Sequence, residues 1–170
     1  MVGDRLYLWA GYQTGLPTVH DSAEERKVTS NVQIFSLPSG KWATQATTGT
    51  SPLGVKGYAC NAVTDKLYYF GGDCNHDGCY HNSVNELDTA SLTWRELEPT
   101  DKHRPVMRRA YGGTITIERD GVYYLLIIGG HGSTPTTQLP QANYIEVVTG
   151  RWRTNERSMY CLSTGKTITT

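Results

Sequence analysis

The chain has 170 residues, of which 38% are hydrophobic and 19% are charged, and its 16 basic residues balance its 16 acidic residues at neutral pH. A disordered chain would be less hydrophobic, and a general binder of nucleic acid or anionic membranes would carry a positive field, so the composition argues against both classes. The longest apolar run, 122–128, is too short to cross a membrane and suits a buried strand.

Residue usage favours strands. The chain contains 11 Tyr, four Trp, 18 Gly and seven Pro, and long helical patterns are missing, so we expect an all-β fold. The first five residues lead directly into strand-like sequence, without the features of a signal peptide or a targeting segment. We therefore expect a cytoplasmic or nuclear protein. In that environment its four cysteines are expected to be reduced thiols rather than a disulfide framework.

Three segments share one pattern along the chain: a hydrophobic strand closed by glycines, a later strand that begins near an asparagine, and a tryptophan. The strands with their glycines are 4–12, 65–73 and 120–131, the later strands begin at Asn31, Asn82 and Asn143, and the tryptophans are Trp42, Trp94 and Trp152. The glycine-to-tryptophan separation is 22 residues in both the second and the third copy. Two markers at matching offsets indicate an internal repeat.

The repeats occupy residues 1–152. The first unit spans 2–42 and lacks an inner strand, the second spans 53–94, and the third spans 105–152. Inner strands are predicted at 58–63 and 110–116, and turns at 38–40, 64–66, 88–91 and 119–121. Residues 153–170 show neither a glycine pair nor a clear strand period, and form a tail or the start of a fourth unit.

This pattern resembles the kelch motif, over roughly residues 2–152. The resemblance implies a partial kelch β-propeller of about three four-stranded antiparallel blades. A kelch blade takes about 50 residues and closed propellers have about four to eight blades, so we expect the chain to form an open arc or a fragment of a six- or seven-bladed ring. Ala10 stands where the other units have the first glycine of the pair, which strains the first blade if that site requires positive φ.

A small sheet cannot bury both of its own faces, so the aromatic side chains of the repeats are predicted to pack between blades. These residues are Trp42, Trp94, Trp152, Tyr68 and Tyr123. The outer faces of the terminal blades would remain apolar and exposed. We therefore expect the isolated chain to associate with itself or with the remaining blades of a ring.

Function is expected in the loops at one rim of the blades. These are the loops after the glycines, 13–28, 73–83 and 131–141, and the connections 43–56 and 95–109. The last of these carries a basic cluster, Lys102, His103, Arg104, Arg108 and Arg109. The first loop is the longest and is either a solvated loop or a partner-binding insertion.

Several kelch proteins use rim arginines to hold carboxylates of partner peptides, and the resemblance carries this role to Arg108 and Arg109. The alternative is that either arginine pairs with an acidic residue of the neighbouring blade. Lys56, Tyr58, Tyr111 and His131 complete the candidate partner-binding set. The two tyrosines are predicted to begin the inner strands at matching places, where they either line the rim or pack against the next blade.

The segment 73–81 holds two cysteines and two histidines within a short loop, Cys74, His76, Cys79 and His81. Such residues can bind zinc, but the spacing differs from common Cys-x-x-Cys knuckles and no second ligand pair lies nearby in sequence. We therefore expect a loop hairpin with chance cysteines, reduced or oxidised to one another, and neither a metal nor a cofactor.

The chain lacks a nucleophile elbow, a phosphate-binding glycine loop and a paired-carboxylate motif, so no enzyme is expected. The resemblance implies protein–protein interaction, with an acidic or C-terminal peptide bound through the rim loops, and partners that are neither nucleic acid nor membrane. Some intracellular kelch domain-containing proteins are substrate receptors of ubiquitin ligases, which gives a finer expectation. The alternatives are a cytoskeletal or structural kelch module and, least favoured, a copper-dependent oxidase of the galactose-oxidase type.

Overall fold

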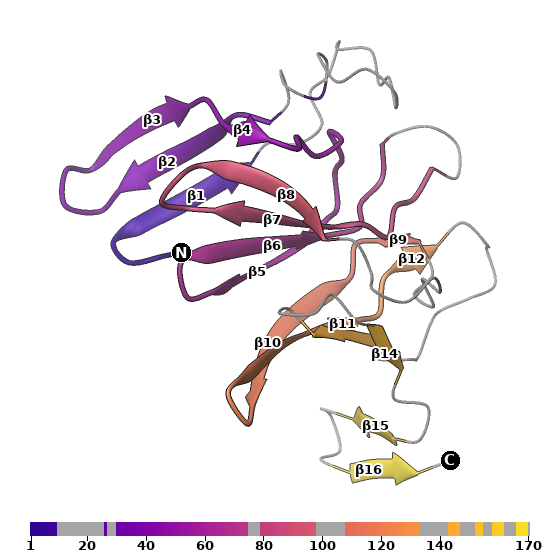
Figure 1. Cartoon of the computed structure of the whole chain (residues 1–170). Coiled ribbons are helices and arrows are strands. Elements are labelled where there is room, and N and C mark those ends of the chain that lie inside the picture. The colour runs from indigo at the N-terminus through magenta and orange to yellow at the C-terminus, as the bar shows by residue number, and fades with distance from the viewer. Residues whose placement is uncertain are drawn as a thin grey trace.

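The computed structural model describes residues 1–9, 26, 30–74, 79–97 and 108–132, together with four later strands whose backbone alone is described. Those strands are β13 (Asn143–Glu146), β14 (Trp152–Thr154), β15 (Ser158–Cys161) and β16 (Lys166–Thr169). The described secondary structure is nearly all strand, arranged in small and mostly antiparallel sheets, which confirms the all-β prediction (Figure 1). Within the described ranges no helix is both long and apolar enough to cross a membrane.

The first sheet has three antiparallel strands in the order β1-β2-β3. These are β1 (Arg5–Trp9), β2 (Val32–Ser36) and β3 (Lys41–Gln45). Side chains alternate across a strand, so Tyr7 and Trp9 point to one face while Leu6 and Leu8 point to the other. The first pair contributes to a core cluster, whereas Leu6 and Leu8 are exposed.

The second sheet has five strands in the order β4-β8-β7-β6-β5. These are β4 (Thr48–Gly49), β5 (Ala59–Val63), β6 (Lys66–Phe70), β7 (Val84–Asp88) and β8 (Thr93–Leu97). The pairing of β4 with β8 is parallel, and the sequence pattern did not predict it. A Cβ atom on Gly49 would lie 2.2 Å from the Trp94 carbonyl oxygen, so only glycine allows this close approach.

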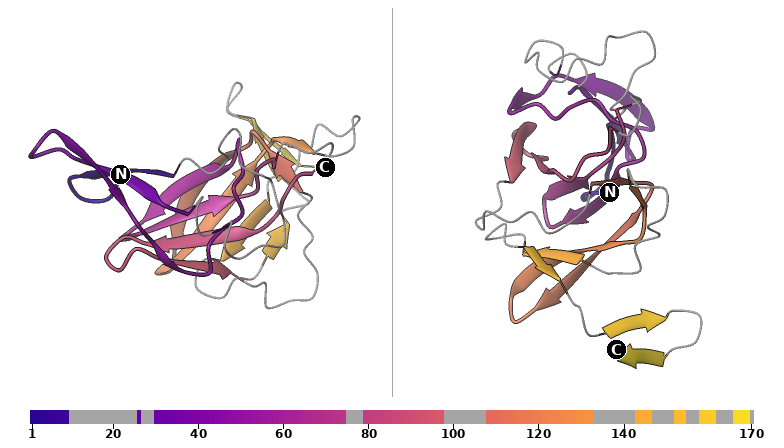
Figure 2. Two further views of the ribbon diagram at one scale, coloured as in Figure 1. Left: turned by 90° about the horizontal axis from the view of Figure 1, so that it is seen from above. Right: turned by 90° about the vertical axis from the view of Figure 1, so that its right-hand side faces the viewer.

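The third sheet is antiparallel in the order β10-β11-β13-β14, where β10 is Gly113–Arg119 and β11 is Val122–Ile128. Just outside it, β9 (Arg109–Ala110) pairs with β12 (His131–Gly132). The chain ends in a hairpin of β15 and β16, although residues 153–170 showed no strand period in the sequence. The three main sheets follow one another in chain order, as the right-hand view of Figure 2 shows.

Tight turns join the inner strands to their neighbours where the sequence predicts them. Thr64 has φ of 53°, and Asp120 and Gly121 have φ of 54° and 75°. Two consecutive residues with positive φ match the twist of a two-residue hairpin, which is why Asp-Gly suits the turn between β10 and β11. These turns set the register in which Ala59 faces Phe70 and Gly113 faces Ile128.

The glycine pairs adopt the same backbone shape in both described copies. Gly71 and Gly72 have φ of 68° and 109°, and Gly129 and Gly130 have φ of 63° and 100°. A Cβ atom on Gly71 would lie 2.3 Å from the Arg109 carbonyl oxygen, so β9 approaches the glycine pair too closely for any side chain there. Ala10 lies outside the described residues.

The second sheet is buried on both faces because β6 alternates between two clusters. On one face, Leu67 and Tyr69 pack with Trp9 and Trp94 of the first and second sheets. The ring centroids of Trp9 lie 5.2 Å from Tyr69 and 5.3 Å from Trp94. On the other face, Tyr68 and Phe70 join a cluster that includes Leu125 and Ile127 of the third sheet and the half-buried Tyr123, so aromatic packing joins the sheets as predicted.

The prediction is wrong for Trp42, which is 52% exposed and stacks on Phe35 of the same sheet, with ring centroids 5.1 Å apart. The physical reason is its position. Trp94 is covered by the first sheet and donates from its indole N–H to the Ser30 carbonyl at 3.0 Å, whereas β3 is exposed along its length. The side chain of Trp152 lies outside the described residues.

The buried Glu86 of β7 stabilises the second sheet through hydrogen bonds from three side chains. Glu86 accepts hydrogen bonds from Lys66 Nζ at 2.9 Å, Arg95 Nη2 at 2.8 Å and the Tyr68 hydroxyl at 2.9 Å. Burial alone would raise the pKa of Glu86, but the hydrogen bonds from Arg95, Lys66 and Tyr68 outweigh it and lower the pKa from 4.5. The carboxylate is therefore held in its charged form.

Candidate partner-binding surface

The inter-blade connections and the glycine loops meet at one end of the sheets, which we call the glycine end. It comprises residues 55–57, 71–74, 79–83, 108–112 and 129–132. Lys56 and Asp73 exchange two backbone hydrogen bonds of 2.9 Å, and the Arg109 backbone bonds to Gly72 and His81 at 2.9 Å each. Backbone pairing between the second and third blades therefore makes this end a fixed platform.

Arg109 belongs to the packing of this platform. Arg109 is 2% exposed, and its guanidinium Nη1 donates a hydrogen bond to the Gly129 carbonyl at 2.8 Å. Burial lowers the pKa of Arg109 from its ordinary value. The prediction that Arg109 presents its side chain to a partner does not fit this position, because Arg109 is buried whereas the preceding Arg108 is exposed.

Arg108 lines a polar cavity of about 230 Å³ together with Arg26, His81 and Glu96. The remaining lining residues are mostly small or amide side chains, Ser51, Pro52, Leu53, Asn82, Ser83 and Asn85. The cavity therefore offers two guanidinium groups, one carboxylate and several amide and hydroxyl groups. Sequence spacing did not link Arg26 or His81 to Arg108, because neither lies near Arg108 along the chain.

The two candidate tyrosines have different places. Tyr58 is half-buried: its hydroxyl donates to the Trp9 carbonyl, and its ring centroid lies 4.9 Å from Trp9 and 5.2 Å from Tyr69. Burial raises the pKa of Tyr58 to about 12. Tyr58 therefore packs against the preceding blade, whereas Tyr111 is 59% exposed and its amide donates to the Gly57 carbonyl at 2.6 Å.

The tyrosines do not occupy matching places, and this correction follows from the register. Ala59 and Gly113 each face the residue before a glycine pair, so they are equivalent. Counting back, Tyr111 corresponds to Gly57, and the two residues have φ of 60° and 66°. The inner strands are thus offset by one residue from the predicted alignment, and Tyr111 holds a backbone conformation that usually selects glycine.

The remaining two candidates flank this surface. Lys56 is half-buried and forms a β-bridge with Asp73. The next residue, Gly57, has its Cα directed at the ring of Tyr111. His131 is exposed, pairs with Ala110, and has its ring 5.7 Å from that of Tyr80 in an edge-to-face arrangement. The structure therefore gathers Lys56, Tyr111, Arg108 and His131 around segments 56–57 and 108–111. Lys102, His103 and Arg104 lie outside the described residues.

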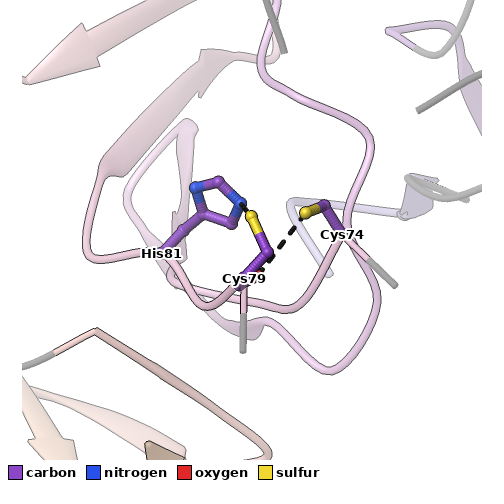
Figure 3. Close-up of side chains that lie close together, drawn as sticks. All are labelled: Cys74, Cys79 and His81. Carbon is purple, nitrogen blue, oxygen red and sulfur yellow. Dashed lines mark hydrogen bonds between the residues drawn. The ribbon is translucent and has the colours of Figure 1, made fainter. Parts of the chain in front are cut away.

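Three potential metal ligands come together in the same region. Cys74 is buried and Cys79 and His81 are half-buried, and their ligand atoms all lie within 4.8 Å of one another (Figure 3). The Cys79 Sγ atom lies 3.6 Å from His81 Nε2, and the Cys74 Sγ atom lies 3.5 Å from the Cys79 carbonyl oxygen. Burial raises the pKa of the Cys79 thiol. His76 lies outside the described residues.

Comparison with known proteins places these features in context. Residues 1–164 match the family described as the KLHDC2/KLHL20/DRC7 Kelch-repeats domain. Kelch domain-containing protein 3 of Bos taurus is 24% identical over 94 residues, which is 55% of this chain and 22% of that protein. Acyl-CoA-binding domain-containing protein 5 of Arabidopsis thaliana is 28% identical over 106 residues, which is 59% of this chain and 16% of that protein. The chain thus spans less than a quarter of these relatives.

Proposed function

The chain belongs to the KLHDC2/KLHL20/DRC7 Kelch-repeats domain family, and on this basis we propose that it recognises a partner protein by binding an acidic or C-terminal peptide at the glycine end. Kelch-repeat domains generally act as non-enzymatic scaffolds for protein–protein interaction. The observation that supports a peptide carboxylate as ligand is the polar cavity that Arg108, Arg26 and His81 line together.

The chemistry of the cavity favours a chain terminus over a simple anion. A guanidinium group can donate two parallel hydrogen bonds to a carboxylate, and Arg108 and Arg26 both line the cavity. Glu96 in the same wall gives the site mixed charge, and Asn82 and Asn85 offer amide partners. A peptide end provides both a carboxylate and backbone N–H donors, so it satisfies both kinds of lining group. In this proposal Tyr111 and Lys56, which lie outside the cavity lining, contact the preceding residues of such a peptide.

The test compares one randomised mixture of short peptides in two forms, with a free carboxylate and with an amidated C-terminus. We expect the chain to retain free-acid peptides and to lose them on amidation. Arg108→Ala should weaken binding by about 10- to 100-fold, since a hydrogen bond to a charged group contributes about 1.5–3 kcal/mol. Arg5→Ala, which removes an exposed arginine from β1, is the matched control and should bind normally. Equal binding of both peptide forms, or normal binding by Arg108→Ala, contradicts the proposal.

A finer role as substrate receptor of a ubiquitin ligase is proposed for the longer protein of which such repeats form part. The ligase-binding element would lie outside the blades described here, and the chain itself would supply only recognition. The corresponding location is the cytoplasm or the nucleus. Ubiquitin transfer to a reporter that carries a selected peptide, compared with its amidated form, tests this role with purified ligase components.

A further inference from the structure

The loop after the second glycine pair holds two thiols and an imidazole in one cluster, formed by Cys74, Cys79 and His81. Their ligand atoms lie within 4.8 Å of one another, although the sequence spacing had argued against a metal. In tetrahedral zinc sites the metal–sulfur distance is about 2.3 Å and the metal–nitrogen distance about 2.0–2.1 Å, which puts neighbouring donor atoms about 3.6–3.8 Å apart. The separation of 3.6 Å between Cys79 Sγ and His81 Nε2 already has this value.

The backbone on both arms of the loop holds these residues in place. The Cys74 amide donates to the Cys79 carbonyl at 3.3 Å, and Asp73 pairs with Tyr80. The His81 amide donates to the Gly72 carbonyl at 2.9 Å, and the His81 carbonyl accepts from Arg109 at 2.9 Å. The glycine pair and the third blade thus anchor the arms of the loop, so a metal would need only small side-chain movements to complete its coordination.

We propose that Cys74, Cys79 and His81 bind one Zn²⁺ ion. The two thiols would release their protons to solvent and bind as thiolates, His81 would donate the lone pair of Nε2, and a water molecule would take the fourth position. Two sulfur ligands and one imidazole favour zinc over hard cations such as Mg²⁺ and Ca²⁺. Because His81 also lines the polar cavity, the ion would fix one wall of it.

The experiment uses the whole reduced chain after removal of metal with a chelator, titrated with Co²⁺ and then with Zn²⁺. We expect one equivalent of Co²⁺ with a thiolate-to-cobalt charge-transfer band and the visible bands of a tetrahedral site, both removed by one equivalent of Zn²⁺. Cys79→Ser and His81→Ala should each weaken zinc binding by more than about 100-fold. These two positions are decisive because both are half-buried, whereas Cys74 belongs to a core cluster and its replacement could unfold the chain.

Two controls separate this site from other thiols and from peptide binding. Cys60→Ser changes an exposed cysteine of β5 outside the cluster and should bind zinc like the parent chain. Arg108→Ala keeps all three ligands and should still bind one equivalent of zinc, so the metal site and the peptide site can fail independently. Sub-stoichiometric zinc, or unchanged affinity in Cys79→Ser and His81→Ala, would overturn the proposal.

Discussion

Neighbouring arginines at the glycine end have opposite roles because the backbone turns one inward and the other outward. Arg109 donates from its side chain to the Gly129 carbonyl inside the packing, whereas Arg108 is exposed beside the polar cavity. The sequence was sufficient to place Arg108 and Arg109 in one basic cluster. It could not assign their directions, because β9 is only two residues long and its partner strand follows more than twenty residues later.

Arg109→Ala should lower the free energy of unfolding by about 1.5–3 kcal/mol, because a charged hydrogen bond is lost and the half-buried Gly129 carbonyl loses a donor. Arg108→Ala, at the exposed neighbouring position, should change it by less than about 0.5 kcal/mol. Urea unfolding of both variants measures the difference. Equal stabilities would place Arg109 outside the packing.

Glu86 should make stability depend on acid. Because its folded pKa lies below the ordinary value of 4.5, its network stabilises the fold at higher pH, and this contribution is lost as the pH falls through the folded pKa. Glu86→Gln should therefore be less stable at neutral pH and show a flatter decline below pH 4.5. Thermal unfolding of both proteins from neutral to acidic pH checks this, and parallel curves would count against it.

The glycine pair acts as a contact point between blades. Gly71 and Gly129 have nearly the same φ, but a Cβ atom on Gly71 would strike the Arg109 carbonyl, whereas nothing among the described residues lies within 4 Å of one on Gly129. Gly129→Ala should therefore show only backbone strain of about 1–3 kcal/mol. Gly71→Ala should lose about 1–3 kcal/mol more from the clash. Chemical denaturation of the two variants separates strain from contact, and equal losses would rule the contact out.

For strands and turns, sequence periodicity predicted the features that depend on residues close together along the chain. The strand 122–128, the glycine pairs and the hairpin at Asp120–Gly121 are all present. Periodicity could not supply features that depend on distant pairing, such as the parallel strand β4 and the one-residue offset that aligns Tyr111 with Gly57. The Cys–His cluster was missed for the same reason, since folding rather than sequence spacing brings its three ligands together.

For the whole molecule, the described arc leaves an apolar face at each end. The first blade exposes Leu6, Leu8 and Trp42, and the third exposes Ile115 and Ile117. In each case these residues point away from the central blade, where a ring would place another blade. We infer that these faces pack against further blades or, in the isolated chain, against a second copy.

Adding charge to these faces should prevent self-association. The double variant Leu8→Lys and Ile117→Lys is expected to run as a smaller species than the parent chain in size-exclusion chromatography with light scattering. Ala90→Lys, which adds the same charge at an exposed turn, should leave the association unchanged. A parent chain that is already a stable monomer would contradict the inference.

The parallel strand β4 has a consequence for anyone who wishes to excise a single blade. Residues 48–49 belong to the connection, yet they hydrogen-bond along β8 at the opposite edge of the sheet from the inner strand β5. A fragment that begins at the repeat boundary, residue 53, would lack β4. The Leu92 and Trp94 carbonyls of the sheet edge would then be free to pair with a strand of another molecule. A fragment designed as a single blade should therefore include residues 48–49.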